Sequence, residues 1–252
     1  MLWACSGGAV ALRILCSNDD GIDAPGLAAL ESALAKLGEV WTVAPNRERS
    51  AQSHALTIHE PLRAEPRGER RFAVSGTPAD CVYLALRELV REPSIVVSGI
   101  NAGSNLGSDV YYSGTVAAAR EACLQNTPSI AISLHGTTHW ATAARVAERV
   151  VTQILENPLP PLVFLNVNVP DLAKIEGIRA APLGRRLWAH AVDRREDPRG
   201  KPYYWIGGPH MAFEGEEADG WWIERGWATA TPISVYPPDH EHMDRIRRWT
   251  DG

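Results

Sequence analysis

The sequence predicts a doubly wound α/β fold, in which a mostly parallel sheet carries helices on both of its faces. Short apolar segments alternate along the chain with longer segments of helical period. Most of the apolar segments end at Gly, Pro or a polar loop, as strands commonly do. A helix separates most successive strands, so the connections are long enough for parallel pairing with right-handed crossovers.

The first part of the chain already contains one complete β-α-β unit. Residues 12–17 form an apolar run that ends at Asn-Asp-Asp-Gly, which indicates a buried strand followed by a polar loop. Pro25 begins a segment with leucines at helical spacing, and Gly38 ends it. Residues 40–44 then make a second apolar run, so the two strands are expected to be parallel neighbours.

The same alternation continues to about residue 170. The later elements are predicted as helices over residues 78–90, 115–124 and 140–155, and as strands over residues 95–98, 130–132 and 163–167. Residues 56–62 and 72–75 interrupt this rhythm and are predicted to form an inserted hairpin.

The chain changes in character after Pro170. Six of the nine tryptophans lie between Trp188 and Trp249, and the alternation of strands and helices is lost. Rings of this size need a surface to pack on, either the main domain or another subunit, and we favour the second. We therefore expect residues 1–11 to be a disordered extension, 12–170 the α/β core, and 171–252 a C-terminal oligomerisation arm belonging to the same structural unit.

Composition excludes several classes of partner. Twenty-five Lys and Arg against 30 Asp and Glu give a net charge of -5, which argues against nucleic acid or an anionic membrane. No segment approaches the roughly 18 consecutive apolar residues of a membrane-spanning helix. The four cysteines are widely spaced, and Cys16 and Cys81 lie inside apolar runs, as buried free thiols do. We therefore expect a cytoplasmic protein.

Polar loops follow several of the predicted parallel strands, and they are expected to meet at one edge of the sheet. Asp19 and Asp20 come directly after the first strand, and loops containing Ser50 and Asn101 follow two others. Neighbouring carboxylates repel each other unless a cation neutralises them. Carboxylate, amide and hydroxyl oxygens suit Mg²⁺, Mn²⁺ or Ca²⁺. The spacing alone is equally compatible with a simple turn or a helix N-cap.

A second candidate feature is the start of the Ala-rich helix. Ser113, Gly114 and Thr115 open that helix, where free backbone N–H groups can hold a phosphate and a glycine allows close approach. Taken alone, this segment is more often an ordinary N-cap. No phosphate-binding G-x-x-x-x-G-K-[ST] and no G-x-S-x-G nucleophile turn occurs in the sequence.

Together these segments resemble the SurE family of metal-dependent 5′-nucleotidases, the stationary-phase survival proteins. The motifs that carry the resemblance occur in the order of the family and comprise residues 14–26, 43–50, 76–82, 97–107, 112–119, 197–206 and 231–232. The resemblance extends from Leu12 to about Pro237. It implies a three-layer, Rossmann-like catalytic core and a C-terminal arm that exchanges between the subunits of a homodimer or homotetramer.

The resemblance also implies a site and an activity. The implied ligands of one divalent cation per subunit, Mg²⁺ or Mn²⁺, are Asp19, Asp20, Ser50 and Asn101. The implied phosphate or substrate contacts are Asn105, Ser113, Gly114 and Thr115. We expect hydrolysis of nucleoside 5′-monophosphates to nucleoside and phosphate, with 3′-monophosphates and short polyphosphate as further substrates, and with Asp20 orienting the attacking water.

Two departures and two alternatives accompany this expectation. Ala51 stands where the family usually has glycine, and residues 1–11 extend the usual N-terminus. A Cβ at position 51 is expected to narrow the mouth of the site or stiffen its loop. The same pocket would also serve a non-catalytic, metal-dependent nucleotide sensor. An aspartyl-phosphate mechanism usually shows Asp-x-Asp, which is absent.

Overall fold

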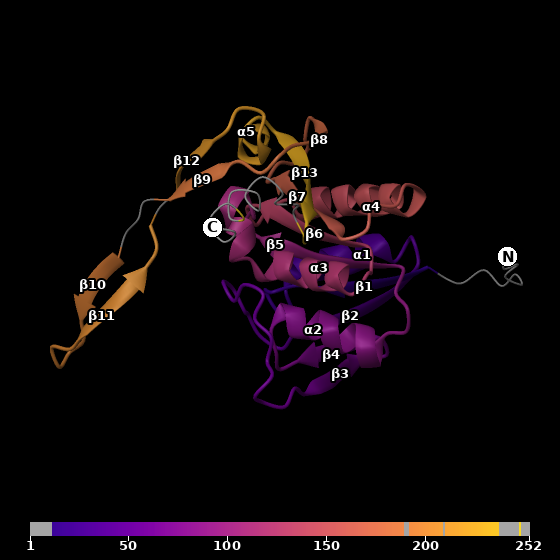
Figure 1. The fold of residues 1–252 in the computed structure, drawn as a ribbon, viewed down its shortest axis with the longest axis horizontal. Coiled ribbons are helices and arrows are strands. Elements are labelled where there is room, and N and C mark those ends of the chain that lie inside the picture. The colour runs from indigo at the N-terminus through magenta and orange to yellow at the C-terminus, as the bar shows by residue number, and fades with distance from the viewer. Residues whose placement is uncertain (1–11, 189–191, 209, 237–246, 248–252) are drawn as a thin grey trace, which may run out of the picture.

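The computed structural model describes residues 12–188, 192–208, 210–236 and 247. The predicted N-terminal extension, residues 1–11, lies outside the described residues. Within them the predicted α/β class is confirmed, because one mostly parallel sheet lies between two layers of helices (Figure 1).

The central sheet has nine strands in the described part of the chain. From one edge to the other they are β3 (Ala64–Gly68), β4 (Arg71–Val74), β2 (Glu39–Pro45), β1 (Arg13–Ser17), β5 (Ile95–Ala102), β6 (Ser129–His135), β7 (Val163–Pro170), β13 (Trp227–Ser234) and β8 (Gly177–Ala180). The six strands from β4 to β7 are parallel. Strand β3 runs antiparallel to β4, and β13 runs antiparallel to β7. The carboxyl ends of the six parallel strands therefore share one edge.

Two pairs of helices cover the two faces of the sheet. Helices α1 (Pro25–Leu34) and α4 (Trp140–Glu156) pack together on one face. Helices α2 (Pro78–Leu84) and α3 (Gly114–Leu124) pack together on the other. A π-helical turn, Ala85–Leu89, continues α2, and a 3-10 turn, Gly107–Tyr111, precedes α3.

The apolar core is divided by the sheet into two sides. Leu27 and Leu30 of α1 and Val151 of α4 belong to one fully buried cluster with the strand residues of that face. Leu15 of β1 and Val82 of α2 belong to the cluster on the other face. Each such side chain contributes roughly 1.5–3 kcal/mol by leaving water. The central strands are thus buried on both of their faces.

The inserted hairpin was predicted with the wrong first strand. Residues 56–62 do not form a strand; β3 (Ala64–Gly68) pairs with β4 (Arg71–Val74) instead. The backbone N–H and the hydroxyl of Thr57 donate to Asp80 at 2.8 and 2.6 Å. These bonds tie Thr57 to α2 and keep it out of the sheet. Residues 56–62 therefore run as a loop above α2.

The C-terminal segment is more regular than its sequence suggested. Strands β8 and β13 from this segment complete the central sheet. It also contains helix α5 (Asp219–Ile223) and a small sheet of β9 (Arg185–Trp188) and β12 (His210–Glu214). Arg179 lies 4.0 Å from the ring centre of Trp222 and 4.3 Å from that of Trp227. These two tryptophans thus pack within their own chain.

Strands β10 (Val192–Glu196) and β11 (Pro202–Ile206) form a separate antiparallel hairpin. It projects away from the central sheet (Figure 1). Tyr204, Trp205 and Ile206 are exposed on it. In the described part of the chain, no helix has both the length and the apolar character needed to cross a membrane.

Candidate metal and phosphate site

The candidate site lies where the strand order reverses. From β1 the chain passes to β2 on one side, and it later returns to form β5 on the other side of β1. Ligands of doubly wound sheets bind beyond the carboxyl ends of the strands at such a switch point. Asp19 and Asp20 follow β1 here, and Asn101 lies near the end of β5.

Asp19 is a buried carboxylate that is held from two sides. The hydroxyl of Thr115 donates a hydrogen bond to Asp19 Oδ1. The backbone N–H of Arg49 donates to the carbonyl oxygen of Asp19 at 2.8 Å. Burial, opposed by the Thr115 hydrogen bond and supported by the charge of Asp20, raises the pKa of Asp19 to about 6. The hydrogen bonds to Asp19 therefore do not fully offset the cost of burying its negative charge.

Asp20 is half-buried and points toward the end of β5. The backbone N–H of Ala102 donates to Asp20 Oδ2 at 3.0 Å. Burial is the main cause that raises the pKa of Asp20; the Ala102 hydrogen bond opposes it and the charge of Glu48 adds to it. No Lys, Arg or His side chain in the described residues forms an ion pair with Asp19 or Asp20.

The other two predicted cation ligands, Ser50 and Asn101, are each next in sequence to a residue whose backbone N–H donates to Asp19 or Asp20. Ser50 follows Arg49, whose N–H contacts Asp19, and Asn101 precedes Ala102, whose N–H contacts Asp20. The Ser50 hydroxyl donates to Glu48 at 2.8 Å, which leaves the lone pairs of its oxygen for a cation. The Asn101 amide donates to the carbonyl of Gly103 at 2.7 Å, and its Oδ1 remains an acceptor.

The donor chemistry fits a hard divalent cation. Among the described residues, no group of three or more His, Cys, Asp and Glu side chains is arranged to hold a metal. A cation at Asp19 and Asp20 would therefore take its remaining ligands from neutral oxygens, which Mg²⁺ and Mn²⁺ accept. The under-compensated pair of carboxylates and the neutral oxygens beside it are compatible with the implied site.

Ala51 has a backbone conformation that usually favours glycine. Its φ is +57°, in the left-handed region, which costs an ordinary residue about 1–2 kcal/mol. Ser53, with φ of +52°, follows in the same loop. The N–H and hydroxyl of Ser53 donate to the carbonyls of Tyr112 and Tyr111 at 3.1 and 2.6 Å. These bonds hold the loop against the segment that leads into α3.

The start of α3 adjoins Asp19 directly. Ser113 caps the helix, and its hydroxyl accepts from the N–H of Val116 at 3.1 Å. A Cβ placed on Gly114 would lie 2.9 Å from the Cβ and 3.0 Å from Oδ2 of Asp19. Asn105 is 8% exposed, and its amide donates to the hydroxyl of Ser133 at 2.9 Å. Gly114 and Thr115 thus lie against Asp19, whereas the side chain of Asn105 is hydrogen-bonded to β6.

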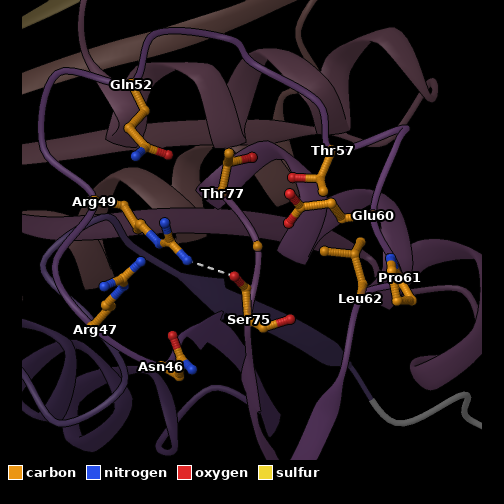
Figure 2. A pocket seen from close by; sticks show the side chains of 11 residues that line it. Asn46, Arg47, Arg49, Gln52, Thr57, Glu60, Pro61, Leu62, Ser75 and Thr77 are labelled. Carbon is orange, nitrogen blue, oxygen red and sulfur yellow. Dashed lines mark hydrogen bonds between the residues drawn. The ribbon is translucent and has the colours of Figure 1, made fainter.

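A cavity of about 480 Å³ adjoins this edge, and Gly76 and Thr77 contribute to its lining. It is lined by the loop after β2, the loop of residues 57–62 and the segment after β4 (Figure 2). Arg47 and Arg49 extend into it from one side, and Glu60 lies on the other. Arg49 donates to the carbonyl of Ser75 at 2.5 Å. In the sequence, the two arginines close together in the loop after β2 are the feature that could have indicated this cavity.

The buried asparagines of β7 were also missed. Asn166 and Asn168 are fully buried in a strand whose other inner residues are apolar, and both donate to the carbonyl of Asn105. Polar side chains at alternate positions of a buried strand are unusual, and this alternation was the available sequence signal.

The fold and this site define the class: a three-layer, doubly wound α/β protein with paired carboxylates and a helix start at its switch point. The family model described as "Survival protein SurE" matches residues 14–190. The chain therefore belongs to the SurE family.

Relatives match this chain over nearly its whole length. The "5'-nucleotidase SurE" of Aeromonas hydrophila is 50% identical over 250 residues, covering 95% of this chain and 99% of the relative. The "5'-nucleotidase SurE" of Alkalilimnicola ehrlichii is 47% identical and covers 96% of each chain. The crystal structure of the SurE protein from Aquifex aeolicus has a TM-score of 0.86 at 38% identity, covering 95% of this chain and 100% of that one.

Proposed function

We propose that this protein is a divalent-metal-dependent phosphomonoesterase that hydrolyses nucleoside 5′-monophosphates to nucleoside and phosphate. The single observation that carries the proposal is the buried, under-compensated Asp19 beside Asp20, hydrogen-bonded to Thr115 at the start of α3. A cation held by these carboxylates would lie next to the helix start that is proposed to hold the phosphate, as phosphate ester hydrolysis requires. The names of relatives that are 46–50% identical support the same activity.

The proposed cation ligands are Asp19, Asp20, Ser50 and Asn101, with one Mg²⁺ or Mn²⁺ per subunit. When bound, the cation would neutralise the two carboxylates and polarise a phosphate oxygen. Ser50, whose side chain is exposed, would bind it through an oxygen lone pair while its hydroxyl donates to Glu48. These neutral and charged oxygens match the ligand preference of both metals.

The proposed phosphate contacts come from α3 and from Asn105. The N–H groups of Gly114 and Thr115 lie in the first turn of α3, where the helix provides no partner for them and its dipole favours a negative charge. The N–H of Thr115 also bonds the Asp19 carboxylate and lowers its pKa. The second N–H of the Asn105 amide supplies a further donor. We assign Asp20 the role of orienting the attacking water and accepting its proton, since it is more exposed than Asp19.

The nucleoside is proposed to occupy the cavity of Figure 2. Arg49 lines this cavity, and its backbone N–H donates to the carbonyl of Asp19 at 2.8 Å, which supports a nucleoside position near the proposed cation ligands. Its lining is largely polar, with Arg47, Gln52 and Glu60 available to bond ribose hydroxyls and base edges. Phosphate at α3 and nucleoside in this cavity would place the ester bond at the switch point.

Replacing Arg47 by Gln is expected to raise KM for a nucleoside 5′-monophosphate about fivefold and to change kcat less than twofold. Arg47 would contact a part of the substrate that does not change during the reaction. The measurement compares this substrate with p-nitrophenyl phosphate, whose kinetics should stay unchanged. Arg67→Gln, at an exposed position on β3, is the matched control. An equal effect on both substrates would show that Arg47 does not contact the nucleoside.

The proposed assembly is a homodimer or homotetramer formed through the C-terminal arm. The support is the β10–β11 hairpin, which exposes Tyr204, Trp205 and Ile206 away from the central sheet. An isolated two-stranded hairpin is rarely stable in water without a surface to pack on. Cys16, Cys81 and Cys123 are free and buried, which supports a location in the reducing cytoplasm.

The activity is tested by measuring phosphate release from 5′- and 3′-nucleotides and from short polyphosphate with Mg²⁺, Mn²⁺ and without metal. We expect release from 5′-monophosphates that a chelator abolishes and that added Mn²⁺ or Mg²⁺ restores. Tight, metal-dependent binding of a nucleotide that remains intact for hours would instead identify a nucleotide sensor. Trapping of a phosphorylated aspartate would replace the metal-activated water with a covalent mechanism.

A further inference from the structure

The backbone of Asn105 is held by the side chain of Asn168. The N–H of Asn105 donates to Asn168 Oδ1 at 2.8 Å, and the amide of Asn168 donates to the carbonyl of Asn105 at 3.0 Å. One side-chain amide thereby satisfies both backbone groups, as a neighbouring strand would do. Asn166 adds a third bond, because its amide donates to the same carbonyl at 2.8 Å.

The side chain of Asn105 is oriented at the same place. Its amide donates to the hydroxyl of Ser133 at 2.9 Å, and Ser133 lies opposite Asn168 in the pairing of β6 with β7. One N–H of the Asn105 amide is therefore used, and the other N–H and Oδ1 stay available. With its backbone fixed by Asn168 and its amide by Ser133, Asn105 has little freedom to turn.

These asparagines occupy positions that apolar residues would fill at lower cost. Both are completely buried, and their neighbours Val167 and Val169 belong to the apolar core. Burying an amide is unfavourable unless it forms hydrogen bonds, and Asn166 Oδ1 has no hydrogen-bond partner among the residues that the structure describes. Asn166 and Asn168 direct their amides to one residue, Asn105, which is a proposed phosphate contact.

We propose that Asn168, assisted by Asn166, is a positioning residue that holds the amide of Asn105 toward the substrate phosphate. The inference rests on the proposed function, and it adds residues from β7 that touch neither the phosphate nor the cation. Small displacements of a phosphate donor have large kinetic effects, which explains why a buried strand would carry two amides for one loop residue.

Asn168→Leu removes both bonds to the Asn105 backbone at similar side-chain volume. We expect kcat/KM for a nucleoside 5′-monophosphate to fall about 20-fold, within the range that misplacement of a catalytic contact produces. The Kd for inorganic phosphate, measured with Mn²⁺ present, should rise by a similar factor. The Kd for Mn²⁺ alone should change less than twofold, because Asn168 contacts no proposed cation ligand.

Two further variants separate positioning from general destabilisation. Ser129→Ala is the matched control, since it removes one buried hydrogen bond, 2.7 Å to the carbonyl of Ala119, at the opposite end of β6. It should lower Tm and leave the phosphate Kd unchanged. Asn166→Leu removes only one of the two bonds to the Asn105 carbonyl, and it should raise the phosphate Kd about threefold even if Asn168→Leu fails to fold.

The decisive measurement is a double-mutant cycle with Asn105→Ala. If Asn168 acts through Asn105, the double variant should lose no more kcat/KM than Asn105→Ala alone. Multiplied losses, or a phosphate Kd that Asn168→Leu leaves unchanged, would overturn the proposal. If the parent protein releases no phosphate with any metal, the proposed function fails. The phosphate Kd values then decide the positioning role on their own.

Discussion

Asp19→Asn should lower kcat/KM for nucleoside 5′-monophosphates at least about 1,000-fold, equivalent to roughly 4 kcal/mol of transition-state stabilisation. The substitution keeps the shape of the side chain and its acceptor for the Thr115 hydroxyl, but removes the charge from the buried half of the carboxylate pair. In the proposed site, cation affinity and phosphate activation depend on that charge. The measurement is phosphate release across a range of Mn²⁺ concentrations, with Mn²⁺ binding followed separately.

The same variant should make the metal-free protein more stable near neutral pH. The pKa of Asp19 is raised to about 6, mainly by burial, above its ordinary value of 3.8. Ionisation therefore costs folding free energy, and this cost is absent below pH 4 and complete above pH 6. Asparagine avoids a cost on the order of 3 kcal/mol. The gain in Tm with chelator present should thus be seen at pH 8 and disappear by pH 4.

Asp23→Asn is the matched control for this prediction. Asp23 lies in the same loop, its side chain is 81% exposed, and its ion pair with Arg71 is 3.4 Å long. We expect its kcat/KM to stay within twofold of the parent and its Tm to be nearly unchanged. Activity of Asp19→Asn within threefold of the parent would contradict the cation site. Added Mn²⁺ should raise the Tm of the parent and of Asp23→Asn, and not that of Asp19→Asn.

The fold class and the sheet edge that carries the candidate site were predictable because both follow from local pattern. The order β1, α1, β2 favours parallel pairing, because a helix between two strands is long enough for the crossover. Parallel pairing brings the carboxyl ends of the strands to one edge. Asp19 and Asp20 then had to lie at the edge shared with β5. The family resemblance supplied the ligand and phosphate assignments, which the adjoining positions of Asp19 and Thr115 support.

Long-range interactions decided what the sequence did not show. The pairing of β3 with β4 was not predicted, because the sequence pattern indicates residues 56–62 as the first strand of the hairpin. Thr57 in that segment is instead hydrogen-bonded to Asp80 of α2, 23 residues away in the chain. The return of β13 to the central sheet depends on its pairing with β7, which no local period indicates. Asn168 gave a signal only as an unexplained polar residue in an apolar strand, since its partner Asn105 is remote in sequence.

Gly114→Ala is expected to lower kcat/KM about 100-fold, because it adds one methyl group where Asp19 and α3 meet. The new Cβ would lie 2.9 Å from the Cβ of Asp19, 3.0 Å from its Oδ2 and 3.0 Å from Cγ of Pro78. Such contacts force either the carboxylate or the first turn of α3 to move, and the proposed cation and phosphate contacts would then both lose their geometry. Measured Kd values for Mn²⁺ and for inorganic phosphate should rise together.

The fold should tolerate this substitution better than the site does. Alanine is favoured over glycine by up to about 1 kcal/mol in a helix interior, and a part of this preference at the first residue of α3 offsets some of the strain. Gly68→Ala is the matched control, because a Cβ there meets only the Cβ of Arg71, at 3.7 Å. It should keep full activity. If Gly114→Ala is folded and retains kcat/KM within threefold, the helix start does not contact the phosphate. A loss of Mn²⁺ affinity with unchanged phosphate affinity would limit the role of Gly114 to making room for Asp19.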